Sequence, residues 1–367
     1  MTEQELSAYI QAIRPADEAA MEAARRRQAQ LAKPPGSLGQ LEEISIRLAG
    51  VTGQVCPAMD KCRVAVFAAD NGVVAEGVSC TPPAVTMQQA VNMTFRKTGM
   101  SAMAAAFGDD VSVVDVGIDG DVPPVGVLDR KVRRGTGDIA REDAMTRQQV
   151  LDAMAAGMEQ AARAKADGVT ALGIGEMGIG NTTTSAAVLA ALTGADIEAV
   201  AGRGGGLTDE GFLRKKEVLR QALALHRPDG NDVIGVLAGV GGLDLAAMTG
   251  AFLGCAHERV PAAVDGFISI AAALCAVRLC PAVRDVLFLS HDSYEVGYRI
   301  AAEALGLQPC LRLGMRLGEG SGCPLLFRVL EGACGVMRGM ATFGEASIED
   351  SYLDEIRAVD AFTVEAT

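Results

Sequence analysis

Residues 169–187, VTALGIGEMGIGNTTTSAA, run from an apolar segment through glycines into a small-residue helix. VTALGIG predicts a buried strand, because a short apolar run bounded by glycine is typical of a strand covered on both faces. Gly173, Gly175 and Gly178 also fit the G-x-G-x-x-G spacing of a dinucleotide-binding turn, which would favour NAD. No Gly-Lys-Ser/Thr follows, so a P-loop for a triphosphate is excluded. The segment therefore predicts a strand, a turn and a helix around NAD or a smaller phosphate.

Five further apolar runs share this design, and helix-like sequence follows each of them. They are RVAVFAAD (63–70), VSVVDVGID (111–119), DVIGVLAGVGG (232–242), PAAVDGFI (261–268) and DVLFLSHD (285–292). The alternation predicts an α/β fold, a parallel sheet with helices on both faces. Ligands of such folds bind beyond the carboxyl ends of the strands. In this sequence those ends carry Asp70, Gly117, Glu176, Gly241, Asp265, Ser290 and His291.

Both ends of the chain lack strand-like runs. We expect residues 1–60 and 325–367 to form a small helical domain beside a large α/β domain of residues 61–324. The N-terminal segment is a charged amphipathic pattern without the apolar core of a signal peptide.

The composition narrows the class of protein. Of the 367 residues, 49% are hydrophobic and only 4% are aromatic, as in α/β enzymes with tightly packed helices. The net charge of −13 and the absence of a Lys/Arg stripe argue against a nucleic-acid partner. No apolar run of membrane-spanning length is free of glycine or charge, so we expect no membrane partner and a cytoplasmic protein. The nine cysteines and three histidines lack zinc spacing and C-x-x-C pairs, which predicts reduced thiols and no catalytic metal.

Two glycine loops are candidates for binding a phosphate. In the first, converging amides at a helix start can hold an anion, and Asn181 with three threonines can either cap the helix or contact the phosphate. The second, GRGGGLTDEGFLRKK (202–216), contains Gly204 and ends in a basic run. Lys215 is the ammonium that we expect at a phosphate, although an ordinary exposed helix face would explain it as well.

The segment MRLGEGSG (315–322) is the third candidate. Glu319 stands between two glycines, so backbone can approach a ligand on either side, and the carboxylate is a candidate general base. A solvated loop glutamate is the alternative. Glu176 provides a second acid, but glycoside hydrolysis needs a pair spacing that the sequence does not supply. His291, Ser293 and Glu295 suggest a triad only weakly, and Ser293 suits a hydrogen bond to a ribose better.

Eight ordered blocks resemble the nicotinate-nucleotide–dimethylbenzimidazole phosphoribosyltransferases of cobalamin lower-ligand assembly, from about residue 30 to about residue 345. The blocks are KPPGSLGQLEEI, ADNGVVAEGVS, TPPAVTMQQAVN, EMGIGNTTT, GRGGGLTDEG, DGFISIAAAL, HDSYEVGY and MRLGEGSG. The resemblance implies transfer of the 5-phosphoribosyl group from nicotinate mononucleotide to 5,6-dimethylbenzimidazole or a related base. It also implies a homodimer with a Rossmann-like large domain and a small domain made from both chain ends, and it adds no cofactor.

The resemblance assigns roles where the motifs match. Glu319 aligns with the family's general base, and Glu176 with a second acid near the ribosyl donor. The resemblance places Gly178, Gly180, Asn181, Thr182 and Lys215 at the phosphate, Ser293, Leu317 and Gly318 at the ribose, and Thr81 and Gln89 at the base. Gly204 is a further expected substrate contact.

Several alternatives remain at this stage. Asn71 stands where the family often has a histidine, so the acceptor could be dimethylbenzimidazole, a plain benzimidazole, a purine or a phenol. An NAD-dependent oxidoreductase is the second hypothesis, from the glycine spacing with Asp196 and Glu198 about twenty residues further on. A nucleotide-binding protein without catalysis is the third.

Overall fold

The computed structural model describes residues 1–123 and 125–354 and contains a six-stranded, all-parallel sheet. The strand order β3-β2-β1-β4-β5-β6 is that of a Rossmann fold, in which the order reverses between β1 and β4. The strands are β1 (Cys62–Ala69), β2 (Asp110–Gly117), β3 (Val127–Asp129), β4 (Ala171–Met177), β5 (Ala262–Val264) and β6 (Leu287–Leu289). The predicted α/β class is therefore confirmed.

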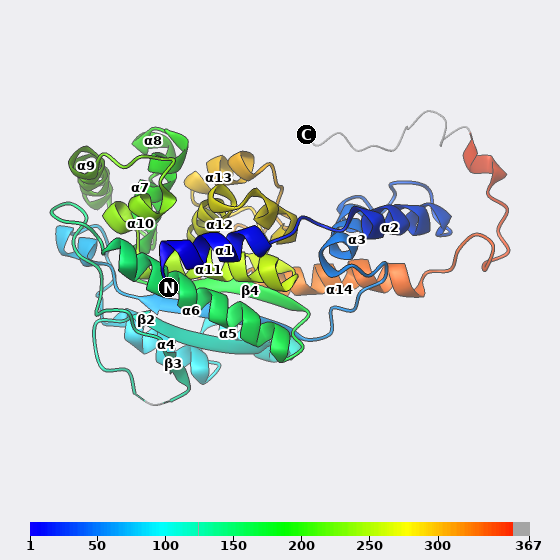
Figure 1. Cartoon of the computed structure of the whole chain (residues 1–367), viewed down its shortest axis with the longest axis horizontal. Helices are drawn as coiled ribbons and strands as arrows, with labels where there is room; N and C mark the ends of the chain where they lie inside the picture. The colour runs from blue at the N-terminus through cyan, green and yellow to red at the C-terminus, as the bar shows by residue number, and fades with distance from the viewer. Residues whose placement is uncertain (124, 355–367) are drawn as a thin grey trace.

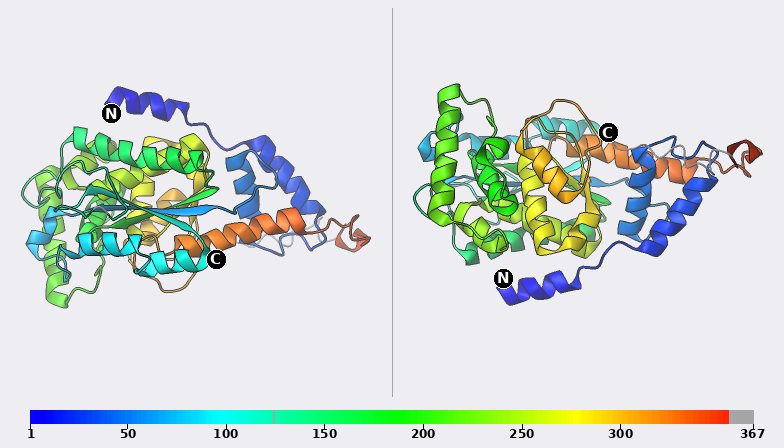
Figure 2. Two further views of the ribbon diagram at one scale, coloured as in Figure 1. Left: turned by 90° about the horizontal axis from the view of Figure 1, so that it is seen from below. Right: turned by 90° about the horizontal axis from the view of Figure 1, so that it is seen from above.

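Helices cover both faces of the sheet (Figures 1 and 2). On one face α11 packs against β1, β2 and β4, with α6 packed on α11; on the other face α4, α5 and α14 lie against the strands. The α-helices before β4 are α1 (Glu3–Ala12), α2 (Glu18–Gln30), α3 (Gln40–Thr52), α4 (Val85–Thr94), α5 (Gly99–Phe107) and α6 (Arg147–Ala166). Those after β4 are α7 (Asn181–Thr193), α8 (Ile197–Val200), α9 (Asp209–His226), α10 (Val233–Val240), α11 (Leu243–Glu258), α12 (Phe267–Leu279), α13 (Gly297–Leu305) and α14 (Cys323–Gly339). Short 3₁₀ helices are η1 (Gly72–Glu76), η2 (Pro281–Val286) and η3 (Ser351–Leu353).

One predicted strand is wrong. The run at residues 232–242 contains helix α10 (Val233–Val240) and no strand, and Gly241 therefore follows a helix. Asp232 caps this helix by accepting a hydrogen bond from the Gly235 amide (3.0 Å), and every residue of α10 except Gly235 is buried. A continuous apolar run has the same pattern in a buried strand and in a buried helix, so its periodicity cannot separate the two.

The sequence did not reveal the edge strand β3. It has three residues, too few for an alternating pattern, and it pairs with β2 from Val113 to Asp115. The sequence therefore predicted the right number of strands, six, but for a partly wrong reason: one predicted strand is helix α10, and strand β3 was not predicted.

Helices α2 and α3, from the N-terminal part of the chain, lie beside α14 at one side of the molecule (Figure 1). Helices α2 and α14 pack against α3, and a buried cluster apart from the main core consists of Ala20, Ala24, Leu31, Ala49 and Met337.

Helix α1 packs instead against α11, where the Tyr9 ring stacks on the His257 ring with the ring centres 4.2 Å apart. Residues 355–367 of the predicted small domain lie outside the described residues.

A membrane-spanning helix is not found in the described part of the chain: none of its helices is both long and apolar enough.

Candidate active site

A cavity of about 260 Å³ opens beyond the carboxyl ends of the strands, at the point where the strand order reverses. Its walls come from the loops after β1, β4, β5 and β6, from the loop before α9 and from residues 316–319. The predicted residues that line it are Thr81, Gln89, Glu176, Gly178, Gly180, Asn181, Thr182, Gly204, Ser293, Leu317, Gly318 and Glu319. Segments that are distant in sequence therefore form one site.

The Glu319 side chain lies in this cavity and is only 5% exposed, so the alternative of a solvated loop glutamate is wrong. Its carboxylate accepts a hydrogen bond from the Met100 amide at the start of α5 (3.2 Å) and a long one from Gln89 (3.5 Å). Burial raises the pKa of Glu319, and the Met100 hydrogen bond opposes the rise. A raised pKa makes this carboxylate a better proton acceptor once it is ionised.

The backbone at Glu319 is left-handed, with φ 63°, between Gly318 at 81° and Gly320 at 83°. For a non-glycine residue this conformation costs about 1 to 2 kcal/mol. Such a cost persists where surrounding contacts hold the chain, and it is typical of functional sites.

The first two glycines of the G-x-G-x-x-G pattern lie inside β4 and form no dinucleotide turn. A Cβ on Gly175 would lie 2.7 Å from the Glu319 carbonyl oxygen and from backbone atoms of Gly320, and one on Gly173 would meet Cys323 of α14 at 2.6 Å. Both glycines let another segment pass close to the strand. The NAD interpretation of this spacing is therefore wrong, and the turn itself consists of Gly178 to Gly180.

Three polar side chains meet behind the glycine turn. Asn181 donates from its amide to both Glu176 and Asp244 (3.0 Å to the latter). Burial raises the pKa of Glu176 to about 8; the Asn181 hydrogen bond opposes this and Asp244 adds to it. Asp244, at the start of α11, was not predicted, and burial raises its pKa to about 6. The raised pKa disfavours the ionised form of Glu176, which suits a positioning group better than a base.

Lys215 is 0% exposed, so the exposed-helix alternative is wrong. It lies on α9 behind the cavity wall and donates to the Thr182 hydroxyl (2.8 Å) and the Gly202 carbonyl (3.0 Å), which connects the two predicted phosphate loops. Burial lowers its pKa to about 8, and Glu295 opposes the fall. The site thus holds a desolvated ammonium beside Thr182 at the start of α7.

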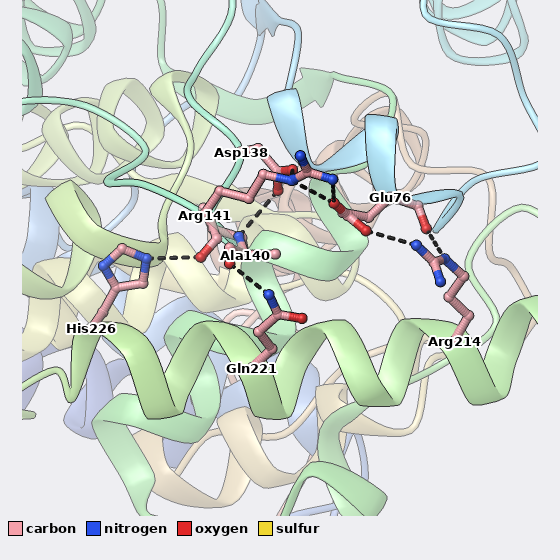
Figure 3. Close-up of polar contacts among 8 residues, drawn as sticks. Glu76, Asp138, Ala140, Arg141, Arg214, Gln221 and His226 are labelled. Atoms are coloured by element: carbon pink, nitrogen blue, oxygen red, sulfur yellow. Dashed lines mark hydrogen bonds and ion pairs between the residues drawn. The ribbon is translucent and has the colours of Figure 1, made fainter.

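An ionic cluster fixes α9 to the loop after β1 (Figure 3). Glu76 accepts hydrogen bonds from Arg141 (2.7 and 2.9 Å) and from Arg214 (2.7 Å), the neighbour of Lys215. Further along α9, Gln221 and His226 donate to the carbonyls of Ala140 and Ile139. Residues 78–81 follow Glu76 and line the cavity, so this cluster connects the helix that carries Lys215 to the segment that leads into this part of the cavity.

The cavity has further lining residues that the sequence did not single out as site residues. Arg316 lies on the Glu319 loop, with its guanidinium 5.5 Å from the ring of Tyr294, and Phe267 and Ile268 begin α12. Arg316 stands three residues before Glu319 in the segment MRLGEGSG, and this position was the sequence signal that could have identified it.

The suggested triad of His291, Ser293 and Glu295 is not formed. His291 and Glu295 line the cavity, but His291 forms a hydrogen bond with Ser290 (2.9 Å) rather than with Ser293.

Comparison with known proteins defines the class. A family model described as phosphoribosyltransferase matches residues 13–348. The chain is a member of this transferase class, in agreement with a buried Glu319 carboxylate in the same cavity as the glycine turn.

The relatives define the family. A nicotinate-nucleotide–dimethylbenzimidazole phosphoribosyltransferase of Clostridium perfringens is 46% identical over 341 residues, 93% of this chain and 94% of the relative. That of Geobacter metallireducens is 46% identical over 347 residues, 94% and 98% of the two chains. A crystal structure of the Thermus thermophilus protein of this name has a TM-score of 0.87 at 44% identity and covers 91% of this chain and 100% of its own. The chain belongs to the nicotinate-nucleotide–dimethylbenzimidazole phosphoribosyltransferase family.

Proposed function

We propose that this protein transfers the 5-phosphoribosyl group from nicotinate mononucleotide to 5,6-dimethylbenzimidazole, giving α-ribazole 5′-phosphate and nicotinate in cobalamin biosynthesis. The observation that carries the assignment to this cavity is the buried Glu319 carboxylate in the same cavity as the loop from Gly178 to Thr182. The names of the relatives support the same donor and acceptor.

The donor phosphate binds at the start of α7. Backbone amides at the start of α7 can donate to an anion there, the helix dipole adds a favourable potential, and Lys215 supplies one positive charge. Gly204, on the opposite loop, contacts the phosphate, while Ser293, Leu317 and Gly318 contact the ribose. A monoester needs no second cation cluster, which fits a glycine-rich turn with one lysine.

The acceptor base lies between Glu319 and residues 78–89, where Thr81 and Gln89 contact it. Glu319 removes the proton from one imidazole nitrogen, and the other nitrogen attacks the anomeric carbon. The bond from that carbon to the pyridinium nitrogen breaks, and its electron pair neutralises the ring, so nicotinate leaves without an acid. Attack from the face opposite the leaving group inverts the β configuration to α. The enzyme thus acts by positioning and by one proton transfer.

Three further parts of the proposal concern the oligomeric state, the location in the cell and the division into domains. The protein acts as a homodimer in the cytoplasm, and residues 1–60 with the C-terminal segment from 325 form a small domain beside residues 61–324. The packing of α2 and α14 on α3 supports the last point.

Chromatography tests the reaction. Nicotinate mononucleotide and dimethylbenzimidazole incubated with the protein are expected to give equal amounts of free nicotinate and a new ribotide. Benzimidazole, adenine and a phenol in parallel samples define the acceptor range. If none of these acceptors releases nicotinate, the proposal is wrong.

A further inference from the structure

Asp265 follows β5 and is 1% exposed, and it does not line the cavity. Its two carboxylate oxygens accept hydrogen bonds from two backbone amides of the Glu319 loop, Gly320 (3.0 Å) and Gly322 (2.6 Å). A hydrogen bond to an ionised acceptor is about twice as strong as a neutral one, and two bonds fix both position and orientation.

The loop that Asp265 holds is the strained one. Gly318, Glu319 and Gly320 are consecutive left-handed residues, and the amides of residues 319, 320 and 322 all point to buried carboxylates. Glu176 accepts from the Glu319 amide at 3.3 Å, and Asp265 accepts from the other two. Successive amides in this conformation form a concave anion site, which here is filled by the protein's own side chains.

We propose that Asp265 is a positioning residue for the transfer reaction: its carboxylate holds residues 318–322 in the left-handed turn that directs the Glu319 side chain into the cavity. The inference rests on the proposed role of Glu319 as the base. Asp265 touches neither donor nor acceptor and acts only through the loop.

The charge of Asp265 has a second effect. Burial raises the pKa of Glu319, and the negative charge of Asp265 raises it further. The other titratable or charged groups that line the cavity with Glu319 are Cys80, Glu176, Arg203, His291, Glu295 and Arg316. His291 lies 3.9 Å from Asp265 and, with the backbone amides, opposes the rise that burial causes in the pKa of Asp265.

The test is Asp265→Asn, which keeps the shape but removes the charge and replaces one acceptor by a donor. We expect kcat to fall about 10- to 100-fold, because a small displacement of a reacting group is costly, while KM for nicotinate mononucleotide changes less than about threefold. The acid limb of the kcat profile should move to lower pH by roughly half a unit to one unit, because Glu319 loses a like charge nearby. Asp265→Ser, which also removes the charge and keeps one acceptor, serves if the asparagine variant does not fold.

Asp115→Asn is the matched control. Asp115 lies near the end of β2, is 2% exposed and accepts from two backbone amides, Gly117 (3.0 Å) and Ile118 (2.8 Å), but it does not line the cavity. This variant should be less stable than the wild-type protein, but its kcat and the pH of the acid limb of its kcat profile should be unchanged. If the Asp265 variants keep kcat, or lose it with an unmoved acid limb, the positioning role is refuted.

Carbon-13 titration of the Glu319 carboxyl, assigned with Glu319→Gln, separates this inference from the proposed function. A lower pKa in Asp265→Asn supports the inference even if no acceptor turns over, whereas an unchanged pKa refutes it. Absence of turnover in the wild-type protein would overturn the proposed function and with it the catalytic meaning of the inference, whereas the titration still tests whether Asp265 acts on the Glu319 carboxyl.

Discussion

Replacing Lys215 by methionine should make the empty protein more stable and donor binding weaker. The side chain keeps its volume and loses a charge that is fully buried. Burial lowers the pKa of Lys215 from 10.5 to about 8. Each pH unit corresponds to about 1.4 kcal/mol, so the ammonium costs the empty protein roughly 3 kcal/mol.

Methionine also leaves two oxygens without a donor, those of Thr182 and Gly202, at about 1 kcal/mol each. The net gain in the free energy of unfolding is therefore about 1 kcal/mol, or roughly 1 to 3 °C in Tm. In the wild-type protein the unfolded chain binds more protons between pH 8 and 10.5, so the contribution of Lys215 to stability rises with pH in that window. The variant should lack this rise.

Donor affinity should change in the opposite direction. A hydrogen bond to a charged group is worth about 1.5 to 3 kcal/mol, so Kd for nicotinate mononucleotide at pH 7 should rise roughly 10- to 150-fold. Above pH 8 the wild-type Kd should rise as the ammonium loses its proton, while that of the variant stays flat. Calorimetry at pH 7 and pH 9.5 with thermal melts of the empty protein measures both effects.

Lys216→Met is the control, since Lys216 pairs with Glu198 on the outside of α9 and should leave donor affinity unchanged. A variant at Lys215 that binds the donor as tightly as wild type, or that melts several degrees lower, would refute this account of the site.

Three further predictions concern the base, the close approach and the ionic cluster. Glu319→Gln should reduce kcat by roughly two to four decades. The Kd for the donor, measured by calorimetry, should stay within about twofold of the wild-type value. A variant with wild-type kcat would exclude Glu319 as the base. Gly175→Ala should lower the free energy of unfolding by about 1 to 3 kcal/mol and reduce kcat, because the new methyl group meets the backbone of the Glu319 loop. Gly335→Ala on α14 is the control and should slightly stabilise the protein, because it has open space around it. Equal denaturant midpoints for the two variants would contradict this prediction. Glu76→Gln should raise the KM for the donor about three- to tenfold and leave kcat unchanged, because α9 loses the ion pair between Arg214 and Glu76. Unchanged steady-state kinetics would show that this cluster does not affect the geometry of the site.

The sequence was sufficient for the parallel α/β class and for most of the strands, because buried strands have a local signal that each run carries by itself. It was insufficient for α10, where an apolar run of the same kind is a helix, and for β3, which is too short to show a pattern. These failures occur where local composition is the same in two structures and only packing separates them.

The amino-acid order alone determined the residue types available at the site: glycine turns, one lysine and a glutamate between glycines. The tertiary structure decided that Lys215 is buried, that Gly175 lies beneath the Glu319 loop, and that Asp265, directly after β5, accepts hydrogen bonds from this loop more than fifty residues further along the chain. Burial and long-range hydrogen bonds depend on how distant segments pack, and they determine which of these side chains carry a perturbed pKa or a strained backbone. The chemistry of the site therefore depends on contacts that no local pattern in the sequence contains.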